Sequence, residues 1–250
     1  MDMPNLPTHI HFSYQSIGKY NGLDLNNNLA IYLFGATAPD IRVITKQDRS
    51  VYHFVQLDFD RVGDGIRNMK NLHPPLDNLN TYDEHTRSFM AGYASHLILD
   101  ETWITTMFRP FFSDTSLFGN KSQGLILDRA LQMYLDKSHW YTLDQNLPHI
   151  ESCDIDIEVE FLKDEPVEDW RNWISTLLNR KFSWDRLEFM ASRIAKGDDA
   201  HPAIGLAKDF ISDPDGGIGD ILEKLPDGIL EDFSSESLKN INKALTEFTQ

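Results

Sequence analysis

The feature that most constrains this fold is His96-Leu97-Ile98-Leu99-Asp100, inside a stretch with helical periodicity from Tyr82 to about Phe108. In an α-helix, side chains four residues apart project from one face, so this imidazole and carboxylate can reach the same point. An ionised carboxylate is costly to bury among apolar side chains unless it is paired or bound to metal. The spacing therefore leaves two interpretations: Asp100 faces solvent or pairs with a Lys or Arg, or His96 and Asp100 are metal ligands.

Three other segments carry side chains of metal-ligand type. Asp40 follows the small-residue segment 35–39, which lets another backbone or a metal come close, and Pro39 favours a turn there. His53 has apolar and aromatic neighbours, whereas His9 and His11 are two residues apart, so at most one of them points inward. Each residue alone also fits a cap, a turn or a hydrogen-bonded core position. Together they predict a split metal site in a helical bundle, with the choice between His9 and His11 open.

Helical periodicity dominates the remaining sequence, and strand-like alternation is scarce, with residues 155–161 as its best instance. We expect an all-α, multi-helix bundle in two parts. Residues 1–196 form a helical metal-binding domain, and residues 197–250 form an acidic helical C-terminal extension packed on it. The expected helices cover residues 8–20, 27–37, 50–71, 82–108, 118–137, 167–178, 184–196, 202–211, 217–224 and 235–248.

The charge of the chain is strongly negative and unevenly placed. Of the net charge of −16, residues 151–250 contribute −12, from 23 acidic and 11 basic residues. Such a chain has no counterion-release advantage on nucleic acid, and it lacks the basic face that anionic membranes attract. We therefore expect no nucleic-acid partner, and we interpret the acidic C-terminal part as a covering layer or a partner-binding surface.

The single cysteine, Cys153, excludes a disulfide framework within the chain and a thiolate metal cluster. Its acidic neighbours are expected to raise its pKa, which disfavours a role as nucleophile. Residues 1–5 lack the basic and apolar regions of a secretory signal, and the apolar run around residues 29–38 is too short to span a bilayer. These features predict a cytoplasmic protein without a transmembrane segment.

The candidate ligands, taken in their order and spacing, resemble the zinc-dependent phospholipase C family over roughly residues 4–110, especially its shorter, cytosolic-looking bacterial members. The matching patterns are Thr8-His9, Gly35-Ala36-x-x-Pro39-Asp40, His53-Phe54 and His96-x-x-x-Asp100. The resemblance implies an all-helical bundle with two or three zinc ions in a cleft.

The resemblance also implies a role for each matched residue. His9 matches the N-terminal histidine ligand, and Asp40 matches a Pro-Asp carboxylate that binds metal and has been considered as the base. His53 matches the histidine that follows it, and His96 with Asp100 matches the family's His-x-x-x-Asp pair, whose carboxylate bridges two metals in that family. The implied ligand set is His9, Asp40, His53, His96 and Asp100.

Two departures reduce the expected number of metal ions. Secreted members use a processed N-terminal Trp as a ligand, and here Met1 and a further run of residues precede His9. Those members also carry a downstream His-x-x-x-Glu pair, but the later histidines, His139 and His149, are followed four positions on by Leu143 and Cys153. We therefore expect one or two ions, with zinc or another divalent transition metal as cofactor.

Such a site would support hydrolysis, because an open position on the metal holds a water of lowered pKa that Asp40 can orient or deprotonate. The sequence predicts a phospholipase C-like hydrolase of a small-molecule or lipid phosphoester. The alternative is a non-catalytic helical protein with a structural metal and an acidic partner-binding surface. The substrate and the oligomeric state stay open, and the reserve ligands are His85, Asp58 and Glu101.

Overall fold

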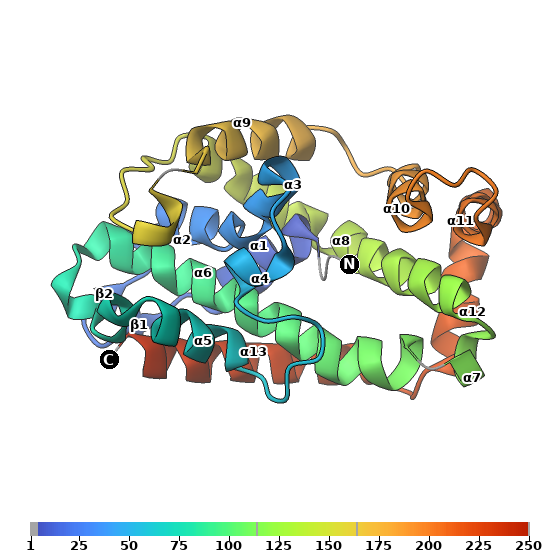
Figure 1. Ribbon diagram of the computed structural model, residues 1–250, viewed down its shortest axis with the longest axis horizontal. Coiled ribbons are helices and arrows are strands. Elements are labelled where there is room, and N and C mark those ends of the chain that lie inside the picture. The colour runs from blue at the N-terminus through green and yellow to red at the C-terminus, as the bar shows by residue number, and fades with distance from the viewer. Residues whose placement is uncertain (1–4, 114, 164, 250) are drawn as a thin grey trace.

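The computed structural model describes residues 5–113, 115–163 and 165–249, and confirms the predicted all-α, multi-helix bundle (Figure 1). Within these ranges the only sheet is a short antiparallel hairpin of β1 (Lys19–Tyr20) and β2 (Leu23–Asp24). The α-helices are α1 (Leu6–Gln15), α2 (Leu29–Gly35), α3 (Arg42–Thr45), α4 (Arg49–His53), α5 (Asp64–Leu72), α6 (Glu84–Trp103), α7 (Thr115–Phe118), α8 (Lys121–Glu151), α9 (Val167–Leu178), α10 (Arg186–Ala195), α11 (Pro202–Ser212), α12 (Pro214–Lys224) and α13 (Ile229–Phe248).

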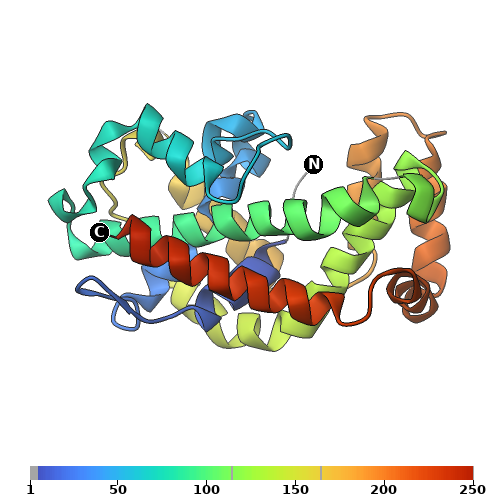
Figure 2. The same cartoon turned by 90° about the horizontal axis from the view of Figure 1, so that it is seen from below.

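Helix α6 is the centre of the bundle. Every side chain from Ser88 to Trp103 is buried, and α1, α2, α5 and α13 all pack against this helix. Figure 2 shows α13 lying along α6 for much of its length. The helix continues past Trp103 as a π-helical segment, Ile104–Phe112. His96 and Asp100 therefore lie in the middle of an element that is covered on all sides.

Helices α2 and α6 approach so closely that only glycine fits at their contact. A Cβ atom on Gly92 would lie 1.9 Å from the carbonyl oxygen of Tyr32, and one on Gly35 would lie 2.1 Å from that of Phe89. The expectation that the small-residue segment admits another backbone is thus confirmed. The contact carries residues 36–40 to the face of α6 that bears His96.

The start of α1 is fixed by a carboxylate from α8. Asp136 accepts hydrogen bonds from the backbone N–H of Thr8 at 3.2 Å, from its hydroxyl at 2.7 Å and from Nδ2 of Asn5 at 2.6 Å. This satisfies one of the first-turn N–H groups that a helix leaves unpaired. The predicted helix over residues 8–20 was wrong at both ends, because α1 begins at Leu6, with Asp136 of α8 accepting from its first turn, and ends at Gln15, before the β1–β2 hairpin.

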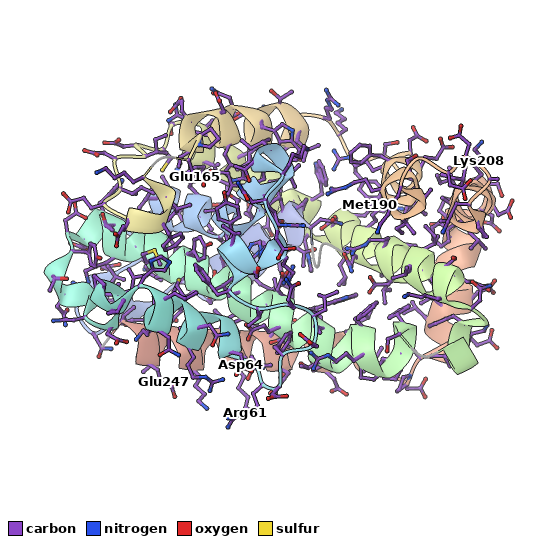
Figure 3. All side chains as sticks on the ribbon, viewed as in Figure 1. Arg61, Asp64, Glu165, Met190, Lys208 and Glu247 are labelled. Carbon is purple, nitrogen blue, oxygen red and sulfur yellow. The ribbon has the colours of Figure 1, made fainter. Side chains whose placement is uncertain are left out.

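The predicted helix over residues 50–71 was also wrong, because the chain forms two helices with a loop between them. Helix α4 ends at His53, where Phe54 takes a left-handed conformation with φ 60°, and α5 begins after Gly63 with φ 99°. Asp64, labelled in Figure 3, accepts hydrogen bonds from the backbone N–H groups of Asp60 and Arg61 and so closes the intervening turn. His53 therefore stands at a helix end, not within a long helix.

The strand-like alternation over residues 155–161 does not form a strand. The segment is irregular, and the side chains of residues 155, 157 and 159 are more buried than those of 156, 158 and 160. The alternation reflects an irregular chain that lies against α6: the backbone N–H of Glu158 donates to the hydroxyl of Thr86 at 3.2 Å. The 3-10 turn Glu160–Leu162 ends it.

The C-terminal helices share their core with the rest of the molecule. Phe233, Ile241 and Leu245 of α13 belong to the same hydrophobic cluster as the buried side chains of α6. Lys196 and Gly197 both have positive φ and separate α10 from the residues that lead into α11. The division of the chain at residue 196 stays a prediction. No helix in the described ranges has the length and apolarity to cross a membrane.

We expect Gly92→Ala to lower the free energy of unfolding by about 2 kcal/mol or more, because the new Cβ must push the α2 backbone away from α6. Chemical denaturation followed by circular dichroism measures the change. Gly205→Ala in α11 is the matched control, since its Cβ meets open space and alanine is the better helix former. Equal stability of the two variants would contradict the close contact.

Candidate metal centre

The structure brings the five predicted ligands together from four elements. His9 comes from α1, Asp40 from the 3-10 turn Ala38–Ile41, His53 from the end of α4, and His96 and Asp100 from α6. Two groups have ligand atoms that all lie within 4.8 Å of one another: His9 with Asp40 and His96, and His53 with His96 and Asp100. Either group can hold a metal ion, and His96 belongs to both.

The individual distances show how tightly these side chains converge. Nε2 of His53 lies 3.1 Å from Oδ2 of Asp100, 3.3 Å from Nε2 of His96 and 3.8 Å from Oδ1 of Asp40. Nε2 of His9 lies 3.3 Å from Oδ1 of Asp100, and the His9 and His96 rings stack in parallel with centroids 3.6 Å apart. Three imidazoles thus surround the Asp100 carboxylate.

His96 is held in the form that binds a metal. Its Nδ1 lies 2.8 Å from the carbonyl oxygen of Ala36, and a carbonyl only accepts, so Nδ1 carries the proton. Burial lowers the pKa of His96 well below its usual value, which keeps the ring neutral. The lone pair of Nε2 then faces the cluster, as in metal sites where a second partner fixes the tautomer of a ligating histidine.

The charges of the other two members of the second group also suit a metal. Burial, together with the Arg49 guanidinium, lowers the pKa of His53 to about 4, so this ring is neutral at pH 7. Burial by itself would raise the pKa of Asp100, but Arg49 and the surrounding histidines outweigh it and hold the pKa well below its usual range. Neutral imidazoles and an ionised carboxylate are the protonation states that metal binding requires.

Several buried polar atoms of the cluster have no hydrogen-bond partner. They are both ring nitrogens of His9, Nδ1 of His53 and Oδ1 of Asp100. Buried polar groups in folded proteins are nearly always partnered, so these orphaned atoms call for a further ligand. A divalent cation bound by either group would supply a partner for ligand atoms of this kind, and the donor set of nitrogen and oxygen fits one.

Arg49 is the residue of this centre that the sequence analysis missed. It is buried, and its Nη2 donates to Oδ2 of Asp100 at 2.5 Å, whereas its Nε and Nη1 atoms have no partner. Arg49 and His53 are four residues apart on α4, and this spacing is the signal that could have revealed it. Asp100 is thus paired with an arginine, as one of its two sequence interpretations expected, and its place in the histidine cluster leaves the metal-ligand interpretation a prediction.

His9, not His11, is the inward-facing histidine of α1. The ring of His11 stacks on His139 with centroids 3.8 Å apart, and its Nδ1 lies 2.9 Å from the hydroxyl of Thr142. Burial and the neighbouring His11 lower the pKa of His139 to about 3. His11 and His139 form a separate pair between α1 and α8.

The three reserve ligands lie outside the cluster. Glu101 accepts hydrogen bonds from the backbone N–H groups of Gly63 and Gly65, which anchors the start of α5 beside His53. His85 contacts the carbonyl oxygen of Asp154 through Nε2, at 2.9 Å, and Asp58 is exposed. Glu101 therefore supports the loop that follows α4 and lies outside both groups of candidate metal ligands.

Cys153 is buried, and burial raises the pKa of its thiol to about 12. The pKa of Cys153 is thus raised, in the direction that the sequence predicts. Burial is the main cause of this shift, and the neighbouring Asp154 adds to it.

Comparison with protein-family models, with curated proteins and with solved structures finds no match for this chain. The resemblance noted in the sequence therefore remains a prediction. The function has to be argued from the geometry of the cluster and its surroundings.

We expect the protein, purified without chelators or a histidine tag, to bind at least one equivalent of zinc. His96→Ala should weaken this binding by more than about tenfold, because His96 contributes to both groups. Isothermal titration calorimetry and elemental analysis measure affinity and stoichiometry. His149→Ala, which removes an exposed histidine, is the control, and equal affinities for the two variants would exclude this cluster as the site.

We expect the metal-free protein to lose stability as the pH falls from 7 to 5. His139 has a folded pKa of about 3, below its unfolded value, so its contribution is present above pH 6.5 and lost as the unfolded chain takes up a proton. His139→Phe keeps the ring contacts and should reduce the loss by at most about 2 kcal/mol at pH 5. Urea unfolding at both pH values measures this, and His149→Phe should leave the loss unchanged.

Proposed function

We propose that this protein is a metal-dependent hydrolase of a phosphoester, similar in chemistry to phospholipase C, with zinc as its metal. The observation that carries the proposal is the convergence of His9, His53, His96, Asp40 and Asp100 around buried ligand atoms without hydrogen-bond partners. Neutral imidazoles with carboxylates suit zinc better than magnesium or calcium, which prefer oxygen ligands.

Access to the cluster supports a catalytic role. His9, His53, His96 and Asp100 are at most 1% exposed, whereas Asp40 is 9% exposed and lines a cavity of about 1060 Å³. A substrate in this cavity would therefore meet the cluster at Asp40. Zinc, when bound, would supply a water of lowered pKa and a positive charge opposite a phosphoryl oxygen.

The residues at and around the cluster would have different roles in the reaction. Asp40 stands at the accessible edge, where its carboxylate can orient a water molecule and accept its proton. Arg49 holds Asp100 ionised from the buried side, and His96 is fixed by the carbonyl group of Ala36. These contacts keep the inner ligands in place while only Asp40 faces the cavity.

A structural metal site is the second candidate, and the deep burial of four of the five residues favours it. A structural site is closed by four protein ligands, whereas a catalytic site keeps one position for water. Asp40 distinguishes the two candidates, because a structural role makes it a permanent ligand and a catalytic role leaves it available to water.

We expect the zinc-loaded protein to hydrolyse members of a panel of phosphomonoesters and phosphodiesters. Asp40→Asn should lower kcat by about 100-fold or more at equal zinc content, because the amide cannot accept the proton of the attacking water. Asp58→Asn, at an exposed carboxylate outside the cluster, is the control. A zinc-loaded protein without activity on the whole panel would favour the structural site.

A further inference from the structure

The wall of the cavity beside Asp40 is rich in basic side chains, although the chain as a whole is acidic. The cavity is lined by seven of the 23 Lys and Arg residues, against three carboxylates, although the whole chain carries a net charge of −16. Two of the basic residues, Lys121 and Arg129, come from α8. The others come from the start of the α9–α10 connection, from α10 and from the residue after it: Arg180, Lys181, Arg186, Arg193 and Lys196.

This placement revises the interpretation of the acidic C-terminal part. Residues 151–250 contain only 11 basic residues, and five of them face this one cavity. The acidic side chains of the same region therefore lie largely elsewhere. The segment that the sequence presents as an acidic cover supplies a positively charged wall next to the candidate metal centre.

Some of these basic side chains are held by contacts within the protein, and others are available to bind a ligand. The Arg186 guanidinium lies over the ring of Trp140 and donates to the carbonyl oxygen of Arg180 at 3.0 Å, and Arg129 donates to Oε1 of Gln132 at 2.7 Å. None of the side chains of Lys121, Arg180, Lys181 and Lys196 forms an ion pair within the described part of the chain.

The carboxylates that line the cavity are already engaged. Asp136 accepts hydrogen bonds from Asn5 and Thr8, and Asp185 accepts one from the hydroxyl of Ser183. The third, Asp40, belongs to the candidate metal centre. The cations that remain available are therefore not neutralised from within the cavity.

The rest of the wall is apolar. Leu6 comes from α1 and Val43 from α3, Leu125 and Met133 line the α8 side, and Trp173 comes from α9. Met190, labelled in Figure 3, belongs to the wall on α10. Ligand cavities enclose roughly 300–1,000 Å³, so a cavity of about 1060 Å³ has room for a charged head and an apolar chain.

We propose that this cavity binds an anionic amphiphile, a molecule with a negatively charged phosphate head and an apolar chain, and that it discriminates against zwitterionic heads. The inference rests on the proposed function, because it names the substrate class that would meet Asp40. Cations at the rim attract the head, and the apolar wall covers the chain. A zwitterionic head brings its own cation against four unpaired cations of the wall, which is unfavourable.

Binding of matched probes to the metal-free protein tests the proposal without requiring hydrolysis. Dodecyl phosphate and dodecylphosphocholine have the same chain and different heads, and isothermal titration calorimetry below their micelle concentrations compares them. We expect dodecyl phosphate to bind about tenfold more tightly or better. Inorganic phosphate and dodecyl maltoside should both bind more weakly than dodecyl phosphate.

The double variant Arg180→Glu with Lys181→Glu should weaken dodecyl phosphate binding by about tenfold or more. Lys208→Glu with Lys239→Glu, at exposed positions outside the cavity wall, makes the same change in net charge and should leave the affinity unchanged. Equal loss in both variants, or equal affinity for the two dodecyl heads, would overturn the proposal. Failure of hydrolysis with binding intact would count against the proposed function alone.

Discussion

The fold depends on compensating the buried negative charge of Asp100. Asp100 stands in the middle of a helix whose side chains are all buried around it, and an isolated carboxylate there would be strongly destabilising. Arg49 from α4 and the imidazoles of His9 and His53 surround it. Elements that are distant in the sequence must therefore meet at one point of α6, and the candidate metal centre is that point.

The glycine contact between α2 and α6 makes this meeting possible. Without a Cβ at Gly35 and Gly92 the two backbones come close, and the carbonyl group of Ala36 reaches His96. The same segment leads into Asp40, which then stands between the buried ligands and the cavity. Packing of two helices thus sets both the tautomer of His96 and the position of Asp40.

The net charge of a sequence segment does not predict where its charged side chains lie in the folded protein. Counting residues marks 151–250 as acidic, yet five of its 11 basic residues line one cavity beside Asp40. A sum over a segment does not record which side of a helix each charge occupies. The tertiary arrangement of α8, α9 and α10 decides this, and it turns a net negative segment into a locally positive surface.

The sequence by itself determined the helical class, the central helix and the pairing of His96 with Asp100, because these follow from local periodicity and spacing. It also singled out the five side chains that meet. Only the tertiary structure decided that His9 faces inward and that Arg49 joins Asp100. It also decided that Asp136 caps α1 and that the alternating segment after α8 finds no partner strand. The physical reason is the same throughout: each of these outcomes depends on contacts between residues far apart in the chain, which local patterns do not encode.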